Sequence, residues 1–334
     1  MKVAVIGAGS WGTTLAQVLA TNGHEVSLWA RKPEVVAGIN EKHRNPRYLS
    51  DSLLSENIVA TLSYDEALAG ARAAVVVTPS NLMREVAKTL SDIVDANLPI
   101  ICCSKGIEGG SGLRSTEIFA LELGNAERLA VLSGPNHAEE IIRGLPSATV
   151  IAAASPVTAG FFQDLFAADT FRTYVSDDVC GVEICAAFKN IIAIAVGLSF
   201  GLGFGDNTAA LLMTRGLAEM GRLVLACGGQ TITCMGLAGA GDLIATCTSA
   251  HSRNRSFGEM LASGKTIEDF NSATHMVAEG ALACKTIKTL ADRYGVELPI
   301  TNMVRGVVWE GLRIDDAAPA LASRPLTTEF WGME

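Results

Sequence analysis

A glycine-rich run near the N-terminus is the first candidate for binding chemistry. Gly7-Ala8-Gly9-Ser10-Trp11-Gly12 follows a short apolar strand candidate and opens a helical segment. In this context Gly7 permits a tight turn, Gly9 lets the backbone approach a pyrophosphate, and Gly12 lets helix and strand pack closely. The amide groups and positive dipole end of the helix would hold the anion. The run predicts a dinucleotide site; the alternative is an ordinary glycine-rich strand–turn–helix.

The residues that follow the second strand candidate indicate whether NADPH or NADH is favoured. Glu25–Trp29 is followed by Ala30-Arg31-Lys32, with no acidic residue at the position that usually binds the ribose 2′-hydroxyl of NAD. A basic pair suits a 2′-phosphate. We therefore expect Arg31 and Lys32 to favour NADPH; the alternative is a solvated loop pair.

Two lysines and an aspartate have the chemistry that ketone reduction needs. The reaction requires a proton donor and a group that stabilises the developing alkoxide. Lys189 stands in an otherwise apolar run, where a lone ammonium is costly without partners. Lys105 follows a strand candidate, where α/β sheets bind ligands, and Asp242 follows a glycine-rich turn. The alternatives are a snorkelling Lys189, a solvent-facing Lys105 and an Asp242 that caps a helix.

A basic segment could recognise a phosphate group. Ser252-Arg253-Asn254-Arg255 supplies hydroxyl, guanidinium and amide donors ahead of a predicted helix. Arginine binds phosphate through two parallel hydrogen bonds. Seen alone, such a segment is more often a solvated surface loop.

The first half of the chain alternates buried strands with amphipathic helices, such as 13–21 and 82–90. Continuous apolar runs are typical of parallel strands buried on both faces. The strand candidates are Val3–Ile6, Glu25–Trp29, Ala73–Thr78, Pro99–Cys103, Leu129–Leu132 and Thr149–Ala153. This alternation predicts a doubly wound, Rossmann-type α/β domain over residues 1–178.

The second half, residues 179–334, predicts an all-α domain. Glycine-rich loops separate long helical patterns, and few strand patterns remain. The main helix candidates are Val182–Val196, Ala209–Ala226, Ser256–Ala262, Val277–Tyr294 and Thr301–Glu310. The apolar stretch 191–205 is too short and glycine-rich for a membrane span, so we expect a buried core helix.

The composition limits the partners of the protein. The chain has 334 residues, a net charge of −9 and 18% charged residues, so nucleic acid and anionic lipid are unfavourable partners. Its eight cysteines and five histidines show no ligand spacing. We therefore expect no metal and reduced thiols. The absence of a signal-peptide pattern predicts a cytoplasmic protein without membrane insertion.

Several fragments together resemble one enzyme family. The resemblance rests on Cys103-Ser104-Lys105-Gly106-Ile107, Leu132-Ser133-Gly134-Pro135-Asn136-His137-Ala138, Ala187-Phe188-Lys189-Asn190, Gly203-Phe204-Gly205-Asp206-Asn207-Thr208, Gly236-Leu237-Ala238-Gly239-Ala240-Gly241-Asp242-Leu243, Ser252-Arg253-Asn254-Arg255 and Val277-Ala278-Glu279-Gly280. In this order they resemble the bacterial NAD(P)+-type glycerol-3-phosphate dehydrogenases over nearly the whole chain. The stretch 236–258 is the most specific part. Two departures are Ala209, where relatives often carry a basic residue, and Asn136-His137, where relatives often carry Thr or Ser then Phe.

The resemblance implies a role for individual residues. Lys189 would be the catalytic proton donor or acceptor, and Arg253 would anchor the phosphate. The implied substrate contacts are Lys105, Gly134, Asn136, Lys189, Asn190, Asp242, Ser252, Arg253 and Asn254. The implied cofactor contacts are Gly7, Gly9, Ser10, Trp11, Gly12, Arg31, Lys32, Tyr48, Lys105, Ala138, Arg253, Val277 and Glu279. His137 is given no role.

The expected reaction is the reduction of dihydroxyacetone phosphate to sn-glycerol 3-phosphate by NADPH or NADH, for glycerophospholipid synthesis. Relatives also suggest a homodimer. One alternative is a β-hydroxyacid or ketopantoate-type reductase, which shares a Rossmann domain followed by a helical domain. Another is a dinucleotide sensor without catalysis, against which the set Lys105, Lys189, Asp242 and Arg253 argues.

Overall fold

The computed structural model describes the chain except residues 251, 275–277, 318–327, 330 and 333–334. It divides into two compact units. The first comprises Met1–Lys105 and Arg114–Val179, and the second comprises Gly106–Leu113 and Cys180–Glu334. The short segment Gly106–Leu113 therefore clusters with the C-terminal unit, although it lies inside the predicted N-terminal domain.

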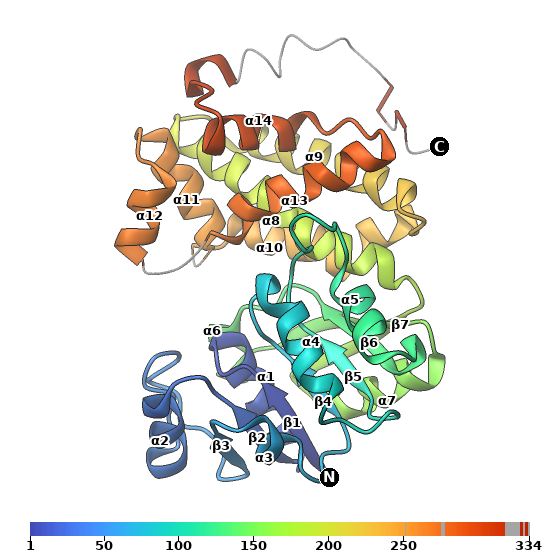
Figure 1. Ribbon diagram of the computed structural model, residues 1–334. Coiled ribbons are helices and arrows are strands. Elements are labelled where there is room, and N and C mark those ends of the chain that lie inside the picture. Colours follow the sequence, from blue (N-terminus) through green and yellow to red (C-terminus); the bar gives the residue numbers. More distant parts are fainter. Residues whose placement is uncertain (251, 275–277, 318–327, 330, 333–334) are drawn as a thin grey trace. The chain divides into compact units, whose positions relative to one another are not determined.

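The first unit is built on a twisted sheet whose order, in the described residues, is β3-β2-β1-β4-β5-β6-β7-β8 (Figure 1). The strands are β1 (Lys2–Ile6), β2 (Glu25–Trp29), β3 (Ile58–Thr61), β4 (Ala74–Val76), β5 (Ile100–Cys102), β6 (Leu129–Ser133), β7 (Ser147–Ala153) and β8 (Phe171–Ser176). The strand order reverses beside β1, between β2 and β4. That reversal is where open α/β sheets bind ligands.

The sheet is mostly parallel rather than wholly so. Strands β1 to β6 are parallel to their neighbours, whereas β7 is antiparallel to β6, and β8 is parallel to β7. The predicted Rossmann-type fold is thus confirmed, with two strands added in the opposite direction. Helices α1 (Ser10–Thr21), α2 (Pro33–Lys42), α3 (Tyr64–Leu68), α4 (Met83–Ser91), α5 (Ser115–Leu123), α6 (Ala138–Ile141) and α7 (Pro156–Phe166), with short 3₁₀ turns at Ser80–Leu82 and Ala126–Arg128, complete the unit.

The core of this unit lies between the central strands and the helices. Val3, Val5 and Leu28 from the sheet are fully buried with Leu15 and Leu19 from α1. Their uninterrupted apolar runs explain why the central strands are visible in the sequence.

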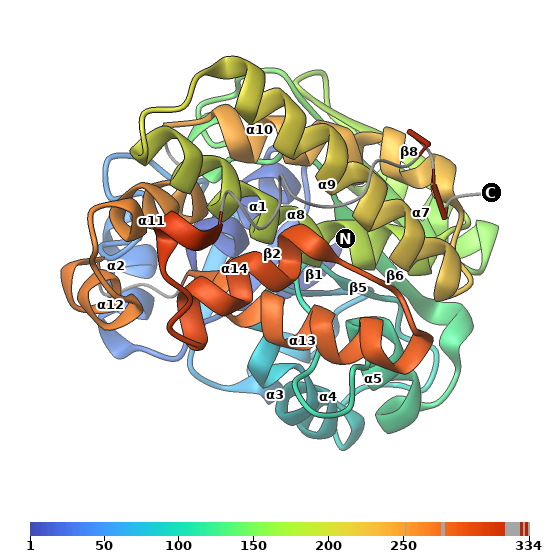
Figure 2. The same ribbon diagram turned by 90° about the horizontal axis from the view of Figure 1, so that it is seen from above.

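The second unit is helical. Its helices are α8 (Val179–Gly201), α9 (Asp206–Ala226), α10 (Asp242–Thr248), α11 (Arg253–Ala262), α12 (Ile267–Thr274), α13 (Glu279–Tyr294) and α14 (Pro299–Trp309), with a 3₁₀ turn at Thr231–Met235 and a π-helical turn at Leu237–Gly241. Figure 2 shows α8 surrounded by other helices of this unit. In the described residues α8 alone is long and apolar enough to cross a membrane, but 89% of its most apolar window is buried. It is a core helix, as predicted.

Glycines let two helices approach the backbone of α8 and let a third pack closely against one of its side chains. A Cβ on Gly258 of α11 would lie 2.2 Å from the carbonyl oxygen of Ile194, and one on Gly280 of α13 would lie 2.5 Å from that of Asn190. A Cβ on Gly216 of α9 would lie 2.7 Å from the Ile192 side chain. Small residues are therefore required at these crossings, and they bring α11 and α13 against the part of α8 that carries Lys189 and Asn190.

Candidate functional site

The glycine-rich turn between β1 and α1 has the geometry of a phosphate cradle. Gly7 has φ +121°, and a Cβ there would lie 2.6 Å from the Val77 carbonyl oxygen. A Cβ on Gly12 would lie 1.7 Å from the Gly7 carbonyl oxygen, whereas a Cβ on Gly9 would meet nothing within 4 Å. Gly7 and Gly12 are therefore required by close backbone packing, whereas Gly9 borders open space that a ligand can occupy.

The N-terminus of α1 is left available to an anion. Gly9 is its N-cap residue in extended conformation, and no side chain caps the helix. The amide groups of the first turn, starting at Ser10, keep no intrahelical acceptor and attract negative charge. Trp11 packs edge-on against Phe171, with ring centroids 6.5 Å apart, and its buried Nε1 has no hydrogen-bond partner. The turn fits a dinucleotide pyrophosphate.

The segment after β2 places two cations beside α2. Arg31 is exposed, and Lys32 is the N-cap residue of α2. The first carboxylate after β2 is Glu34, which lies in the first turn of α2 and pairs with Arg47 at 3.3 Å. Glu34 therefore does not stand at the strand end, where a ribose-binding acid is usual.

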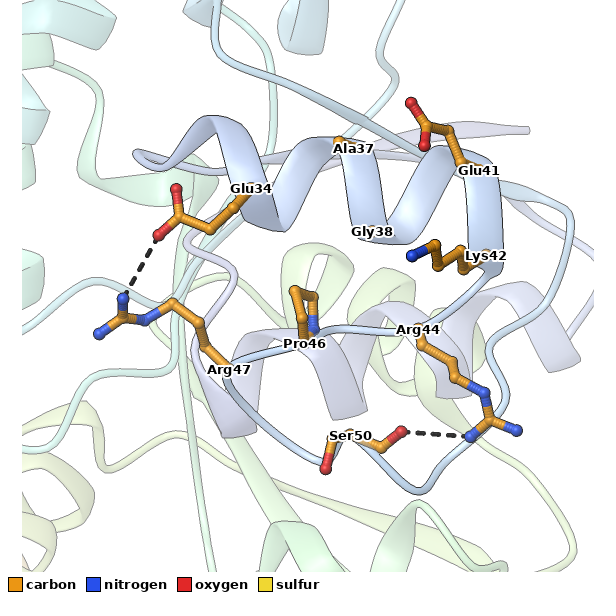
Figure 3. Close-up of a pocket in the computed structure, with 9 residues that line it drawn as sticks. All are labelled: Glu34, Ala37, Gly38, Glu41, Lys42, Arg44, Pro46, Arg47 and Ser50. Atoms are coloured by element: carbon orange, nitrogen blue, oxygen red, sulfur yellow. Dashed lines mark hydrogen bonds and ion pairs between the residues drawn. The ribbon is translucent and has the colours of Figure 1, made fainter.

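The loop after α2 carries Tyr48 and lines a surface pocket of about 500 Å³ (Figure 3). Tyr48 is half-buried, and its backbone N–H donates to Asn45 Oδ1 at 3.2 Å. The pocket is lined by Glu34, Ala37, Gly38, Glu41, Lys42, Arg44, Pro46, Arg47 and Ser50. Tyr48 and the glycine-rich turn are not among the lining residues, so this pocket is not the dinucleotide cradle itself.

A second group in the first unit gathers where β5 and β6 end. Lys105 Nζ donates to the Gly134 carbonyl oxygen at 3.1 Å. Asn136 Nδ2 donates to the Ala148 carbonyl oxygen at 3.1 Å, while its buried Oδ1 has no partner. These parallel strands end at the same sheet edge, which brings together the predicted substrate contacts of this unit.

Lys189 lies in a buried polar cluster of the helical unit. Its side chain is 9% exposed, and Nζ lies 2.9 Å from Asp242 Oδ1 and 2.6 Å from Thr246 Oγ1. Asp242 is the first residue of α10 and follows the π-helical turn, and Thr246 stands one helical turn later. The carboxylate offsets the cost of burying the ammonium group. Thr246 was missed by the sequence analysis, although its i+4 spacing from Asp242 places both on one helix face.

Asn190 and Asn254 connect three helices beside this cluster. Asn254 Nδ2 donates to Asn190 Oδ1 at 2.9 Å, and the backbone N–H of Gly280 donates to Asn254 Oδ1 at 2.9 Å. These bonds leave Asn190 Nδ2 buried without a hydrogen-bond partner. An orphaned buried amide is costly, so Asn190 Nδ2 is a donor that its own surroundings do not satisfy.

The basic segment is helical rather than a turn ahead of a helix. Ser252 is the N-cap residue of α11 and accepts the Arg255 N–H at 3.2 Å, so Arg253 is the first helical residue. Arg255 pairs with Glu259 at 2.9 Å and donates to the Thr248 carbonyl oxygen at 2.8 Å. Arg253 is exposed. Its guanidinium stands at a helix N-terminus, which also favours anions.

The remaining predicted contacts are dispersed. Ala138 begins α6, is buried, and accepts a hydrogen bond from Thr14 of α1 at 3.3 Å. Glu279 is exposed in the first turn of α13, next to Gly280. Val277 lies outside the described residues.

The cysteines nearest to the two lysines, Cys103 and Cys247, are buried. No group of histidine, cysteine and acidic residues in the described part of the chain could hold a metal ion. Burial raises the pKa of the Cys247 thiol to about 12, against the opposing effect of Lys189, and also raises the pKa of Cys103 near Lys105. Burial therefore favours the uncharged form of both thiols.

The fold and these clusters together define a two-unit NAD(P)-dependent oxidoreductase, with a dinucleotide cradle on a Rossmann-type sheet and a buried lysine–carboxylate pair in a helical unit. Residues 2–159 match the family model for the N-terminus of NAD-dependent glycerol-3-phosphate dehydrogenase, and residues 178–319 match that for its C-terminus. The chain belongs to the NAD-dependent glycerol-3-phosphate dehydrogenase family.

Individual members of this family are similar to the chain over nearly its full length. The chain is 45% identical over 332 residues to a glycerol-3-phosphate dehydrogenase [NAD(P)+] from Corynebacterium jeikeium, covering 98% of this chain and 100% of the relative. It is 43% identical over 328 residues to that of Moorella thermoacetica, covering 98% and 97%. A crystal structure of glycerol-3-phosphate dehydrogenase from Coxiella burnetii has a TM-score of 0.92 at 37% identity, covering 97% of this chain and 99% of that one.

Proposed function

We propose that this enzyme reduces dihydroxyacetone phosphate to sn-glycerol 3-phosphate, using NADPH or NADH, and thereby supplies glycerophospholipid synthesis. Family membership supports the reaction. The single observation that carries the mechanism is the buried contact of Lys189 with Asp242 and Thr246. The family does not favour a keto-acid reductase, and the buried ion pair argues against a sensor without catalysis.

Lys189 is the proposed proton donor in the reducing direction. The Asp242 carboxylate favours the ammonium form of Lys189, and the Thr246 hydroxyl fixes the direction of Nζ. A bound nicotinamide supplies or accepts the hydride. Lys189 Nζ gives its proton to the substrate oxygen as the alkoxide forms, and takes it back in the reverse reaction.

The substrate contacts are assigned by charge and hydrogen-bonding capacity. In the helical unit Arg253 anchors the phosphate, Ser252 and Asn254 support it, and the free Asn190 Nδ2 donates to substrate or cofactor. In the first unit Lys105, Gly134 and Asn136 form the substrate-side group. We assign residues 1–178 as the dinucleotide-binding domain and residues 179–334 as the helical substrate-binding and catalytic domain, with some contacts to each ligand coming from the other domain.

The cofactor contacts are proposed on the same grounds. Gly7, Gly9, Ser10, Trp11 and Gly12 form the cradle for the pyrophosphate, and Arg31 and Lys32 favour the 2′-phosphate of NADPH. Further assignments, carried by the family pattern, are Tyr48, Lys105, Ala138, Arg253, Val277 and Glu279. A cytoplasmic location is supported by the eight cysteines, which form no disulfide in the described residues. A homodimer remains a prediction that sedimentation analysis would test.

The deciding experiment compares two substrates. NADPH oxidation is measured with dihydroxyacetone phosphate and, in parallel, with unphosphorylated dihydroxyacetone. Turnover with the phosphate ester alone is the expected result, because the substrate site requires an anion. Turnover of unphosphorylated keto acids instead would favour the reductase alternative.

A further inference from the structure

Asn45 is a fully buried polar residue in the loop after α2, and it belongs to none of the sequence motifs. Its Nδ2 donates to the Ala8 carbonyl oxygen at 3.0 Å and to Thr13 Oγ1 at 2.8 Å. Its Oδ1 accepts the backbone N–H groups of Arg47 and Tyr48, both at 3.2 Å. One side chain thus connects the glycine-rich turn, helix α1 and the loop.

The bond to Ala8 fixes the orientation of one peptide group in the cradle. The carbonyl oxygen of Ala8 and the amide hydrogen of Gly9 belong to the same planar trans peptide, so they point in opposite directions. Because Asn45 holds the oxygen toward the protein interior, the Gly9 N–H points the other way. The space beside this residue is not filled by the protein, because a Cβ built on Gly9 would meet nothing within 4 Å.

The loop that carries Asn45 is itself firmly held. The Arg44 N–H donates to the Gly38 carbonyl oxygen at 3.2 Å, and the Leu54 N–H donates to the His43 carbonyl oxygen at 2.8 Å. A Cβ on Gly38 would lie 2.6 Å from Pro46 Cδ, so loop and helix α2 are in close contact, as Figure 3 shows. The loop and helix α2 therefore hold Asn45 in place, and Asn45 in turn holds the Ala8–Gly9 peptide group of the glycine-rich turn in one orientation.

We propose that Asn45 is a positioning residue for the dinucleotide. It aims the Gly9 N–H at the pyrophosphate through Ala8, and it holds Tyr48 beside the same turn through Oδ1. Neither contact touches the reacting atoms. The pyrophosphate is common to NADPH and NADH, whereas the 2′-phosphate is not. Loss of Asn45 must therefore weaken the binding of both cofactors by the same factor and leave the rate of the chemical step unchanged.

The test measures cofactor binding by calorimetry on the full chain without substrate. For Asn45→Ala we expect Kd for NADPH and for NADH to rise together by at least about tenfold, which is the loss expected when a buried hydrogen-bond donor is removed. At saturating cofactor, kcat should stay within roughly a factor of two. In contrast, Arg31→Ala should weaken NADPH alone.

Two matched variants separate positioning from stability. Asn40 makes a similar pair of bonds from α2 to the Ala60 backbone, at 2.9 and 2.7 Å. Asn40→Ala should lower Tm without moving either Kd. Thr13→Val removes the second acceptor of Asn45 but keeps the bond to Ala8, so it should bind both cofactors like the wild type.

The opposite pattern would overturn the proposal. If Asn45→Ala lowers Tm as Asn40→Ala does and leaves both Kd values unchanged, Asn45 only stabilises the loop. If Asn45→Ala does not fold, Asn45→Asp decides. That variant keeps the acceptor for Arg47 and Tyr48 but sets a carboxylate oxygen against the Ala8 carbonyl. An unchanged Kd in Asn45→Asp would rule out the positioning role.

Discussion

The contact between Lys189 and Asp242 gives the most direct prediction about single residues. Lys189→Ala removes the proposed proton donor, so kcat for dihydroxyacetone phosphate should fall by about 10²- to 10⁴-fold. Lys288 of α13, a lysine paired with Asp292 in the same unit, offers a matched control. Lys288→Ala should retain the wild-type kcat. An unchanged kcat in Lys189→Ala, measured by NADPH oxidation, would exclude Lys189 as the acid–base group.

Arg253 should act on binding rather than on the chemical step. Arg253→Ala removes the proposed phosphate anchor, so we expect KM for dihydroxyacetone phosphate to rise by at least about tenfold, with a smaller change in kcat. The residual rate with unphosphorylated dihydroxyacetone should not change. Arg313, which is exposed and paired with Asp316, provides the control. If KM for the phosphate ester is unaffected, the anchor lies elsewhere.

The sequence indicates candidate site residues more readily than the side chains that contact them. Lys189 and Asp242 are named from motif and resemblance, because charged residues are unusual in apolar or glycine-rich surroundings, and Asn254 is named from its place in the basic segment. Thr246 and Asn45 were missed, since threonine and asparagine are ordinary residues whose value depends on which atoms face them. Those contacts join residues 57 and 37 positions apart, which no local pattern reveals.

At the level of elements, two glycines in helices of the first unit should respond oppositely to the same substitution. A Cβ on Gly12 of α1 would lie 1.7 Å from the Gly7 carbonyl oxygen, whereas one on Gly160 of α7 meets nothing within 4 Å. Gly12→Ala should lower the free energy of unfolding by at least roughly 1–3 kcal/mol. Gly160→Ala should stabilise it by about 0.5–1 kcal/mol through helix propensity. Thermal unfolding without cofactor measures both, and equal effects would contradict the close contact at Gly12.

The elements that the sequence missed are the two edge strands. β3 and β8 lie at the ends of the sheet order, and each leaves part of one face exposed. β8 carries the polar residues Arg172 and Thr173 between its apolar ones, and β3 has only four residues, so neither strand shows the long apolar run that marks the central strands. The antiparallel direction of β7 was also not predicted, because apolar content reports burial and not strand direction.

At the level of the whole molecule, a buried carboxylate should make stability depend on pH. Glu219 of α9 caps the N-terminus of α14, where Oε1 accepts the Ile300 N–H at 2.5 Å and Oε2 accepts the Thr301 N–H at 3.2 Å. Burial raises the pKa of Glu219 from 4.5 to about 7, although these bonds and the Arg222 charge oppose the shift. Between pH 4.5 and about 7 the folded protein therefore keeps a proton on Glu219 that the unfolded chain has already released.

The sign of the pH effect follows from that difference in bound protons. The contribution of Glu219 to the free energy of unfolding should be greatest below pH 4.5, fall as pH rises toward 7, and then level off. The total change in this contribution should be at most about 3 kcal/mol. Glu219→Gln should remove this component, so the stability difference between wild type and variant should shrink or reverse between roughly pH 5 and 8. Thr301→Val deletes a hydroxyl that donates to the carboxylate at 3.2 Å, and it should move the decline to higher pH. Denaturant unfolding at a series of pH values tests this, and a pH-independent difference between wild type and Glu219→Gln would mean that Glu219 is ionised throughout.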